Sequence, residues 1–365
     1  MTGDGTSVED VAVHVGRRSG LDIVVAVDST LLGPALGGCR VQRYPTQDAG
    51  RRDAARLASA MTVKAALAGL SNGGGKVVVV LPEGEPALDV QQRRQLLLDV
   101  GDLVEAQCGH YLVGPDVGTG PADMDVIGER TAHVLCRTER AGGSGDSAPA
   151  TALGTYSCMR VVRESLTGSS SLADARVGVI GLGSVGGRLA RMLADDGAEL
   201  VVADIDASRR TVAERVGAEW RHPDVVPTLE LDILVPAGTG ALIGPDLVDR
   251  LRCGAVVGPA NNQLTDDRVA DGLHRRGVLW APDYVVGAGG IVNAVARERA
   301  VVPATEAEAR VRAIATTLRS VLDDAAQQDR APHRVAAEHA RKRLDAAAAA
   351  RSAGHLTATR NSYHS

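Results

Sequence analysis

The stretch ARVGVIGLGSVGGRLARMLADDGAELVVADID, residues 175–206, constrains the fold more than any other part of the sequence. An apolar run is followed by a glycine turn, a helical segment and a second apolar run, which predicts a strand, a helix and a second strand. Gly181, Gly183 and Gly186 give the turn the spacing GxGxxG. That spacing alone is weak, but its place between a strand and a helix indicates a dinucleotide-binding unit.

Short apolar segments go on alternating with helical ones after this unit. LDILVPA, GAVVGPA and GVLWAPD, at 231–237, 254–260 and 277–283, predict further strands. The alternation is typical of a parallel sheet with crossover helices, so we predict an α/β protein with a doubly wound, Rossmann-type domain. The small, polar segment AGGSGDSAP at 141–149 is the best linker to a first, N-terminal α/β domain.

The glycine turn predicts a site for NAD. Gly181 permits the tight turn, Gly183 lets the backbone approach a pyrophosphate, and Gly186 lets the helix pack on the sheet. The helix N-terminal amides would face the phosphates. Asp204 ends the second strand, where it would bind the adenosine ribose and repel a 2′-phosphate, which favours NAD over NADP. The predicted cofactor-binding residues here are Gly181, Gly183, Ser184, Val185, Gly186 and Asp204.

Composition limits the remaining possibilities. A chain of 365 residues suggests two domains, and a formal net charge of -5 gives no reason to expect nucleic acid or an anionic membrane as a partner. The five cysteines are widely spaced without metal-ligand spacing, so we predict reduced thiols and no metal. With no signal-peptide pattern and no apolar run of about 20 residues, a cytoplasmic protein is expected.

The stretch LSNGGGKVVVV, residues 70–80, resembles a phosphate loop only superficially. Leu70 stands where the first glycine should be, Val77 stands where Ser or Thr should hold magnesium, and the strand follows the lysine instead of preceding it. Lys76 therefore needs another role. A predicted helix over 45–70 carries Lys64 on or beside its apolar face, so we expect Lys64 and Lys76 to face one cleft.

Two lysines, a carboxylate and a nicotinamide together suggest amino-acid chemistry. Asp116 follows a break at Gly114-Pro115 after a predicted strand. One cation can bind a substrate carboxylate, while a desolvated amine beside another cation has a lowered pKa and can act as a general base. The alternative for each lysine is an ordinary surface salt bridge.

Eight stretches closely resemble the glutamate/leucine/phenylalanine/valine dehydrogenase family, in order, from about residue 20 to about 325. The resemblance implies the reversible, NAD-dependent conversion of an L-amino acid to a 2-oxo acid and ammonia. The overall likeness is to valine- and leucine-type enzymes. The stretches are GPALGGCR (33–40), MTVKAALAGL (61–70), GGGK (73–76), GPDVGT (114–119), DMD (123–125), GLGSVGG (181–187), ANNQL (260–264) and APDYVVGAGG (281–290).

The resemblance implies a role for each polar residue. Lys76 resembles the catalytic lysine that activates water, and Asp116 resembles the catalytic aspartate that handles the amino-group proton. Lys64 resembles the lysine that binds the substrate α-carboxylate. Asn262 resembles an asparagine that holds substrate and cofactor, and Thr151 matches a threonine that contacts the nicotinamide amide. By this interpretation, the three glycines before Lys76 let substrate and nicotinamide approach the backbone.

The resemblance also narrows the substrate side chain. Glutamate-specific members carry a lysine where this chain has Leu36, and burying an unpaired carboxylate is costly, so we expect an apolar, branched-chain or aromatic substrate. Gly114 stands where phenylalanine-type enzymes also have glycine. Small residues at Gly114 and Ala294 would enlarge the pocket and favour a bulky side chain. The predicted substrate-binding residues are Leu36, Gly38, Lys64, Gly114, Asn262, Ile291 and Ala294.

Two stretches depart from the family pattern. Gly287 stands where the family usually has asparagine, and residues 237–241 differ from the usual Cys-Ala-Leu-Gly-Gly beside the cofactor, where Ala237 and Gly238 are expected to contact NAD. Two alternatives stay open: a specialised biosynthetic dehydrogenase or imine reductase for a non-standard amino acid, and a non-catalytic NAD-binding relative. The intact set of Lys64, Lys76 and Asp116 argues against the second.

The predicted domains follow from these assignments. Residues 1–143, with C-terminal helices at about 325–351, form the substrate, catalytic and oligomerisation domain. Residues 144–324 form the NAD-binding domain, and 352–365 form a disordered tail. Because family members are oligomers, we expect a homo-oligomer whose other partners are a small-molecule amino acid, its 2-oxo acid and ammonia.

Overall fold

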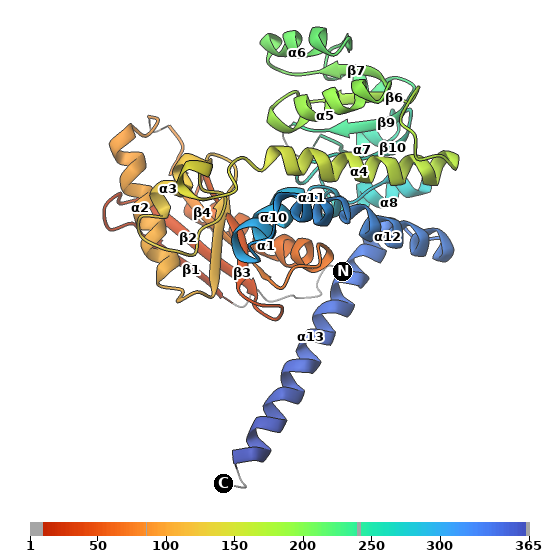
Figure 1. Ribbon diagram of the computed structural model, residues 1–365. Helices are drawn as coiled ribbons and strands as arrows, with labels where there is room; N and C mark the ends of the chain where they lie inside the picture. The colour runs from red at the N-terminus through yellow and green to blue at the C-terminus, as the bar shows by residue number, and fades with distance from the viewer. Residues whose placement is uncertain (1–9, 85, 239–241, 363–365) are drawn as a thin grey trace. The chain divides into compact units, whose positions relative to one another are not determined.

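The computed structural model describes residues 10–84, 86–238 and 242–362, with side chains described as far as Ser352 (Figure 1). The predicted two-domain α/β architecture is confirmed. The chain divides into two compact units, one made of residues up to Asp146 together with those from His339 onward, the other of Ser147–Glu338.

The first unit contains a five-stranded sheet in the order β1-β2-β4-β3-β5. The pairs β1–β2 and β2–β4 are antiparallel, whereas β3 pairs in parallel with both β4 and β5. The strands are β1 (Asp10–Val15), β2 (Asp22–Ser29), β3 (Ala35–Tyr44), β4 (Gly73–Pro82) and β5 (Tyr111–Pro115). The helices before residue 130 are α1 (Gln47–Leu67), α2 (Val90–Glu105) and α3 (Pro121–Ile127).

Helices cover both faces of this sheet. Ala54 and Ala58 of α1 pack with Val78 of β4, while Leu96 of α2 packs on the opposite face with Val77. All residues of β4 from Gly73 to Val80 are buried, which explains why this segment, apart from Lys76, consists of glycine and valine. Because side chains alternate along a strand, Lys76 lies on the same face as Val78, beneath α1.

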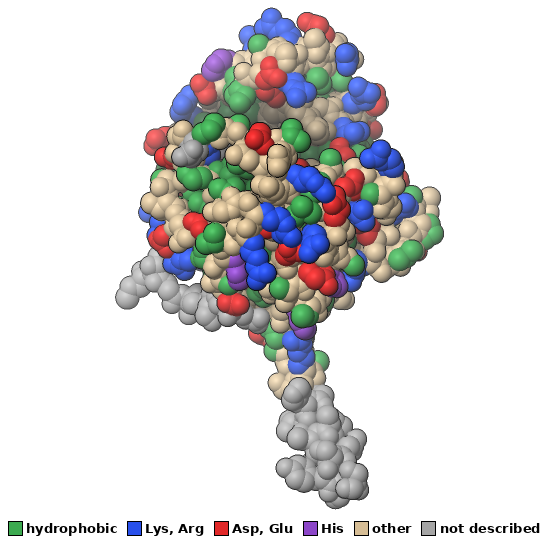
Figure 2. Space-filling view, turned by 90° about the vertical axis from the view of Figure 1, so that its left-hand side faces the viewer, with side chains coloured by type: hydrophobic (Ala, Val, Ile, Leu, Met, Phe, Trp, Pro, Cys, Tyr) green, Lys and Arg blue, Asp and Glu red, His purple; other side chains and the backbone are tan. Residues whose placement is uncertain are grey.

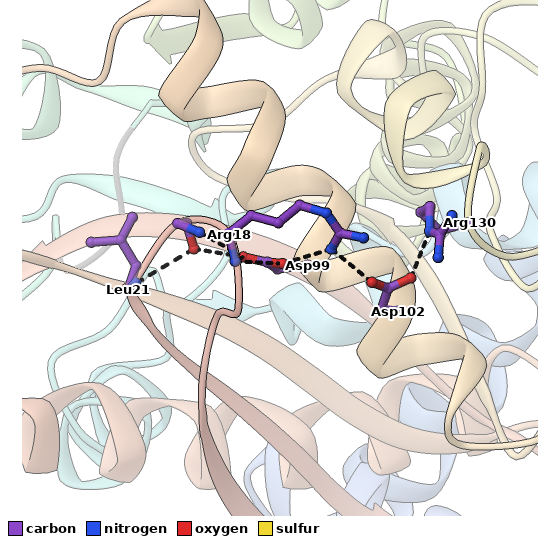
Figure 3. A network of polar contacts seen from close by, with 6 residues as sticks. Arg18, Leu21, Asp99, Asp102 and Arg130 are labelled. Atoms are coloured by element: carbon purple, nitrogen blue, oxygen red, sulfur yellow. Dashed lines mark hydrogen bonds and ion pairs between the residues drawn. The ribbon is translucent and has the colours of Figure 1, made fainter.

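A polar cluster fixes the loop between β1 and β2 to α2 (Figure 3). The Asp99 carboxylate accepts hydrogen bonds from the backbone N–H groups of Arg18 and Ser19, at 3.0 and 2.9 Å, and from Nη1 of Arg18 at 2.8 Å. The same Nη1 reaches Asp102, which is also paired with Nε of Arg130 at 2.6 Å. Asp99 is almost fully buried, and its bonds satisfy loop donors that have no strand partner.

The second unit contains a six-stranded sheet in the order β11-β10-β9-β6-β7-β8, and all its pairings are parallel. Strand β6 lies between β7 and β9, so the strand order reverses there, which is where this architecture binds ligands. The strands are β6 (Arg176–Ile180), β7 (Glu199–Ala203), β8 (Glu219–Trp220), β9 (Leu231–Pro236), β10 (Cys253–Val256) and β11 (Leu279–Trp280).

The α-helices of this unit connect and cover the strands (Figure 1). Helix α4 packs along α5, α10 and α12. The helices are α4 (Ala148–Thr167), α5 (Ser184–Asp195), α6 (Arg210–Arg215), α7 (Pro245–Val248), α8 (Asp267–Arg275), α9 (Asp283–Val286), α10 (Gly289–Ala294), α11 (Ala304–Arg312) and α12 (Ile314–Gln328).

Helix α13 (Pro332–Ser362) begins in the second unit and ends in the first. Residues 325–338 differ from the expectation, because they belong to the second unit: the Tyr284 hydroxyl donates to the carbonyl of His333, whose ring packs 6.1 Å from that of Trp280. Beyond them, Arg343 donates to the carbonyls of Ala66 and Leu70, so α13 braces the first unit.

The break between the units after Asp146 lies within the expected linker at 141–149. The backbone of α13 is helical as far as Ser362, and the disorder expected for 352–365 stays a prediction.

The surface carries mixed charges. Figure 2 shows basic and acidic side chains interspersed over one face of the molecule. Exposed ion pairs such as Arg94–Glu129 and Arg310–Glu306 join opposite charges at this surface. Among the described residues, no helix is both long enough and apolar enough to cross a membrane.

Candidate functional site

Lys76 and Asp116 form a buried ion pair in the first unit. Nζ of Lys76 lies 2.6 Å from Oδ2 of Asp116, and their side chains are only 6% and 14% exposed. Lys76 projects from the centre of β4, while Asp116 directly follows β5. The structure thus brings together the two residues that the sequence predicts to be catalytic.

The loop that carries Asp116 is held firmly to β3. The hydroxyl of Thr119 accepts the backbone N–H of Asp116 at 2.9 Å and donates to the carbonyl of Cys39 at 2.8 Å. The N–H of Val41 donates to the carbonyl of Val117 at 2.9 Å. These bonds continue the parallel pairing of β3 and β5 past Pro115, so hydrogen bonds to β3 fix the position of the loop that carries the Asp116 carboxylate.

Arg40 contacts the same carboxylate oxygen. Its Nε lies 2.9 Å from Oδ2 of Asp116, and its Nη1 lies 3.1 Å from Oδ2 of Asp53 on α1. The hydroxyl of Tyr44 donates to that oxygen of Asp53 at 2.7 Å, and Arg56 binds the other one at 2.7 Å. Positive and negative groups therefore alternate on the side of the sheet that α1 covers, in the order Arg56, Asp53, Arg40, Asp116 and Lys76.

Burial and pairing shift both pKa values. Burial lowers the pKa of Lys76, and this effect outweighs the opposite influence of the Asp116 carboxylate. Burial alone would raise the pKa of Asp116, but Lys76 and Arg40 outweigh it and lower that pKa to about 2. The carboxylate is therefore charged at neutral pH, while the lysine loses its proton more readily than a free lysine.

Small and apolar residues surround this pair on the sheet face beneath α1. Leu36 and Gly38 of β3 pair in register with Leu112 and Gly114 of β5. By strand alternation, these positions share the face of Lys76. A Cβ added to Gly114 would meet no atom within 4 Å, so the space above Gly114 is open. Leu36 is buried and supplies no charge, as the sequence predicts.

The interpretation of the three glycines before Lys76 is wrong. A Cβ on Gly73 would lie 1.7 Å from the carbonyl oxygen of Ser29, and one on Gly74 would lie 2.1 Å from the backbone nitrogen of Thr62. A Cβ on Gly75 would lie 2.4 Å from the ring of Tyr111. The glycines are thus required by β2, α1 and β5 of the protein itself, and not by an approaching ligand.

Lys64 lies in the last turn of α1, the helix that covers the face carrying Lys76. Its side chain is buried, which differs from the ordinary exposed lysine of a helix surface. Arg343 of α13 binds the carbonyls of Ala66 and Leu70 just beyond it, and so fixes the end of this helix.

The glycine turn of the second unit has the geometry of a phosphate-binding turn. Gly181 has φ +99°, and a Cβ on Gly186 would lie 1.9 Å from the carbonyl oxygen of Gly181, so neither position accepts a side chain. A Cβ on Gly183 would meet nothing within 4 Å. The first bond of α5 runs from the N–H of Gly187 to Gly183, which leaves the amides of residues 184–186 at the helix N-terminus.

Asp204 follows β7 and is tied to this turn. Its Oδ2 accepts the backbone N–H of Leu182 at 2.6 Å, and its Oδ1 accepts that of Asp206 at 2.8 Å. Each oxygen retains lone pairs for a ribose hydroxyl. The carboxylate therefore lies beside the glycine turn with its orientation fixed.

Ala237 and Gly238 also lie against the turn. The N–H of Ala237 donates to the carbonyl of Ile180 at 2.8 Å, and a Cβ on Gly181 would lie 2.5 Å from the nitrogen of Gly238. The rest of the departing segment, residues 239–241, lies outside the described residues.

Thr151 lies in the first turn of α4, where its hydroxyl donates to the carbonyl of Ser147 at 2.9 Å. A Cβ on Gly290 would lie 3.0 Å from Oγ1 of Thr151, so the start of α10 packs directly on that of α4. In α10, Ile291 is half-buried and Ala294 is buried. Gly287 has φ -83°, a conformation that any residue adopts.

Asn262 has φ +54°, in the left-handed region, within the loop after β10. Its neighbour Gln263 is fully buried and holds this loop. The Gln263 backbone N–H donates to Asp283 at 3.0 Å, its amide nitrogen donates to Gly258 at 2.6 Å, and its amide oxygen accepts Nε1 of Trp280 at 3.1 Å.

Sequence reasoning did not assign a site role to Arg40, Asp53 or Gln263. Arg40 stands two residues after Gly38, so strand alternation places it on the same face and could have found it. Asp53 is one of many charged residues of α1, and Gln263 has no spacing that distinguishes it from a loop residue.

The predicted site residues fall into two sets, one in each compact unit. The first unit gathers Leu36, Gly38, Lys76, Gly114 and Asp116 on one face of its sheet, with Lys64 on the covering helix. The second unit gathers the glycine turn with Asp204, Ala237 and Gly238 at the carboxyl ends of its strands, and holds Thr151, Asn262, Ile291 and Ala294 in its loops and helices.

Two family models match the chain. The model described as Glu/Leu/Phe/Val dehydrogenase, dimerisation domain, matches residues 7–133. The model described as Glutamate/Leucine/Phenylalanine/Valine dehydrogenase matches residues 202–352. Both compact units are therefore represented, in the expected order.

Individual proteins are similar over most of the chain. A leucine dehydrogenase from Thermoactinomyces intermedius is 38% identical over 286 residues, which cover 78% of this chain and 77% of that protein. A valine dehydrogenase from Streptomyces coelicolor is 40% identical over 294 residues, 78% of each chain. The crystal structure of L-tryptophan dehydrogenase from Nostoc punctiforme matches with a TM-score of 0.77 and 30% identity, covering 92% of this chain and 96% of that one.

Proposed function

Because the chain belongs to the glutamate/leucine/phenylalanine/valine dehydrogenase family, we propose that it catalyses the NAD-dependent oxidative deamination of an apolar L-amino acid. The reaction converts the amino acid, NAD⁺ and water to the 2-oxo acid, ammonium, NADH and a proton, and it is reversible. The observation that carries this proposal is the buried contact between Lys76 and Asp116, on a sheet face where the space above Gly114 is open.

The chain's own residues divide the chemistry between binding and proton transfer. Lys64 binds the substrate α-carboxylate. Lys76, with its lowered pKa, takes a proton from the water that attacks the imine carbon of the oxidised substrate. Asp116, charged and held by the loop after β5, handles the proton of the amino group. Asn262 helps to hold the substrate in place.

The second unit fits NAD. The support is the open space above Gly183, the free helix N-terminus at residues 184–186 and the oriented carboxylate of Asp204. These groups would hold the pyrophosphate and the adenosine ribose, and Thr151 would contact the nicotinamide amide. When bound, NAD supplies the acceptor for the hydride from the substrate α-carbon.

The substrate side chain would lie against Leu36 and above Gly114. Leu36 offers no partner for a side-chain carboxylate, which disfavours glutamate. The open space above Gly114 favours a side chain larger than valine. The similar proteins named for leucine, valine and tryptophan all act on apolar amino acids, which supports the same choice here.

A second candidate is a specialised dehydrogenase or imine reductase for a non-standard amino acid. It is favoured by the departures at Gly287 and residues 237–241, which change groups beside the cofactor. Neither departure alters Lys64, Lys76 or Asp116. The same pair of domains would then act on a different apolar side chain.

We expect the enzyme to be a homo-oligomer. The first family model is described as a dimerisation domain, which supports this expectation. Size-exclusion chromatography with light scattering would measure the mass, and a monomer would contradict it.

A panel of amino acids tests the proposed function directly. Each L-amino acid is mixed with NAD⁺ and the protein, and NADH formation is followed by absorbance. Turnover of leucine, phenylalanine or tryptophan, with little turnover of glutamate, is the expected result. Turnover of a non-standard amino acid alone would favour the second candidate, and NADH from none would refute catalysis of this kind.

A further inference from the structure

Two cations share one oxygen of Asp116. Lys76 Nζ lies 2.6 Å from Oδ2, and Arg40 Nε lies 2.9 Å from the same atom. A single ion pair would leave the carboxylate without a partner whenever Lys76 lost its proton. A buried carboxylate without a partner is costly, so the pair alone would hold the lysine in its charged form.

We propose that Arg40 is a positioning residue that keeps Asp116 charged and in place, so that Lys76 can release its proton without leaving the carboxylate unpaired. This inference rests on the proposed function for its catalytic meaning. The contacts that carry it lie entirely within the first unit.

Arginine suits this position because of its charge and its shape. The guanidinium group does not lose its proton in a protein, so its charge stays constant when that of Lys76 changes. Its Nε and Nη1 point to two different carboxylates, Asp116 and Asp53, which a single ammonium group cannot orient in the same way. The side chain of Arg40 is 10% exposed, so solvent screens these contacts little.

Asp53 balances the charge of Arg40 and is itself held from two sides. The Tyr44 hydroxyl and Arg56 both donate to its carboxylate. Asp53 thereby prevents Arg40 from acting as an uncompensated buried charge. It also lies within electrostatic reach of Lys76, on which its effect opposes that of Arg40.

Three charged groups act on Lys76. Arg40 faces it from β3, Asp116 from the end of β5, and Asp53 from α1. The other buried charged residues nearby in the fold are Lys64 on α1 and Asp28 on β2. Asp116 and Asp53 raise the pKa of Lys76, and Arg40 lowers it in addition to the lowering by burial.

The lysine content of the chain makes a direct test practical. Lysine occurs three times, as Lys64, Lys76 and Lys342. Lys342 is exposed on α13 and serves as an internal reference. Protein labelled with [ε-¹³C]lysine would therefore give one signal per lysine, which can be assigned with Lys64→Ala and Lys76→Ala and titrated without any substrate.

Two variants have opposite expected effects. Arg40→Gln removes a positive neighbour, so the pKa of Lys76 should rise; Asp53→Asn removes a negative one, so it should fall. Unchanged titration of Lys76 in Arg40→Gln with an intact circular dichroism spectrum, or shifts of the same sign in both variants, would overturn the proposal. If Arg40→Gln does not fold, Asp53→Asn decides: no fall in the Lys76 pKa refutes the proposal.

The activity readout separates this inference from the proposed function. In Arg40→Gln, the limb of the kcat/KM profile that depends on neutral Lys76 should move to higher pH. At a pH below that limb, kcat/KM falls about tenfold for each pH unit of the movement. If the Lys76 pKa shifts as expected in the variants but the wild-type protein turns over no amino acid, the proposed function is refuted and the inference about Arg40 stands. If the wild-type protein turns over amino acids but the Lys76 pKa does not shift in the variants, the inference is refuted and the proposed function stands.

Discussion

Gly38 and Gly114 are paired in register on neighbouring parallel strands, yet they leave out a side chain for different reasons. A Cβ on Gly38 would lie 2.7 Å from Cβ of Asp116, so this glycine protects the position of the carboxylate. A Cβ on Gly114 would meet nothing within 4 Å, so that glycine leaves space. The pair offers matched substitutions with different expected outcomes.

Gly114→Ala should narrow the substrate space without disturbing the fold. We expect kcat/KM for the bulkiest accepted amino acid to fall relative to that for a smaller one, by about 1–3 kcal/mol of discrimination. Kinetics with two substrates of different size, and the melting temperature, would measure this. Equal losses for both substrates would show that Gly114 does not border the side chain.

Gly38→Ala is the matched control for that substitution. It should reduce kcat for every substrate alike, because the new methyl group would displace Asp116. A change in substrate preference without a loss of kcat would mean that Gly38 borders the substrate side chain and does not act by protecting the position of Asp116.

Lys76→Ala should abolish turnover, and Asp116→Asn should nearly do so, because each removes a group that we propose to transfer protons. Binding of NADH, followed by its fluorescence, should persist in both variants because the glycine turn lies in the other unit. NADH formation at the wild-type rate in either variant would rule out the assigned roles.

Lys64→Ala should mainly raise the KM for the amino acid, because it removes the cation proposed for the α-carboxylate. Lys342→Ala, at an exposed position of α13, is the matched control and should leave KM unchanged. Steady-state kinetics at saturating NAD⁺ would decide. A KM that does not move in Lys64→Ala would exclude carboxylate binding there.

Asp204→Ala should weaken NAD binding because it removes both the proposed acceptor for the ribose hydroxyls and the bond to Leu182 of the glycine turn. We expect a Kd increase of about tenfold, which corresponds to about 1.4 kcal/mol. Asp206→Ala is the control, since Asp206 bonds locally to Ser208. Isothermal titration with NADH would measure both, and similar effects for the two variants would refute the special role of Asp204.

Asp99 should make the first unit sensitive to acid. Burial raises the pKa of Asp99, but hydrogen bonds from Ser19 and Arg18 outweigh it, so the pKa is lowered in the folded protein. Because the pKa of Asp99 is lower in the folded protein than in the unfolded chain, where it is about 3.9, the charged carboxylate stabilises the folded protein at any pH above about 3.9. This stabilisation is lost as the pH falls from that value through the lowered pKa of the folded protein. Asp99→Asn should lower the free energy of unfolding at pH 7 by about 1–3 kcal/mol.

Asp102→Asn is the matched control in the same cluster. Asp102 is more exposed and pairs with Arg18 and Arg130 near the surface, so its loss should cost about 0–1 kcal/mol. Urea unfolding of both variants at pH 7 and pH 3 would test the pair. A difference between Asp99→Asn and wild type that stays constant with pH would contradict the account.

The sequence predicted the family, the two-domain α/β fold and the amino-acid dehydrogenase activity, and these predictions are confirmed. The GxGxxG spacing, in its place between a strand and a helix, was enough to predict the dinucleotide-binding fold, because Gly181 and Gly186 are required by contacts within one strand-turn-helix unit. The roles of individual site residues stay predictions.

Contacts between distant segments explain what the sequence did not reveal. The glycines before Lys76 face β2, α1 and β5, and only the strand register shows this. Arg40 and Asp53 lie among many charged residues, so their meeting with Asp116 required the packing of α1 on the sheet. One overlooked signal was lysine content: only three of the 40 basic residues are lysine, and two of them are the buried Lys64 and Lys76.

The path of α13 makes the first unit discontinuous in sequence, because the whole of Ser147–Glu338 is inserted between its two parts. A ribosome delivers Ala66 and Leu70 some 270 residues before the Arg343 that caps them. The first unit therefore stays incomplete until the inserted second unit has been synthesised, and a nascent chain ending before His339 would have α1, the helix that carries Lys64, without its contacts to Arg343.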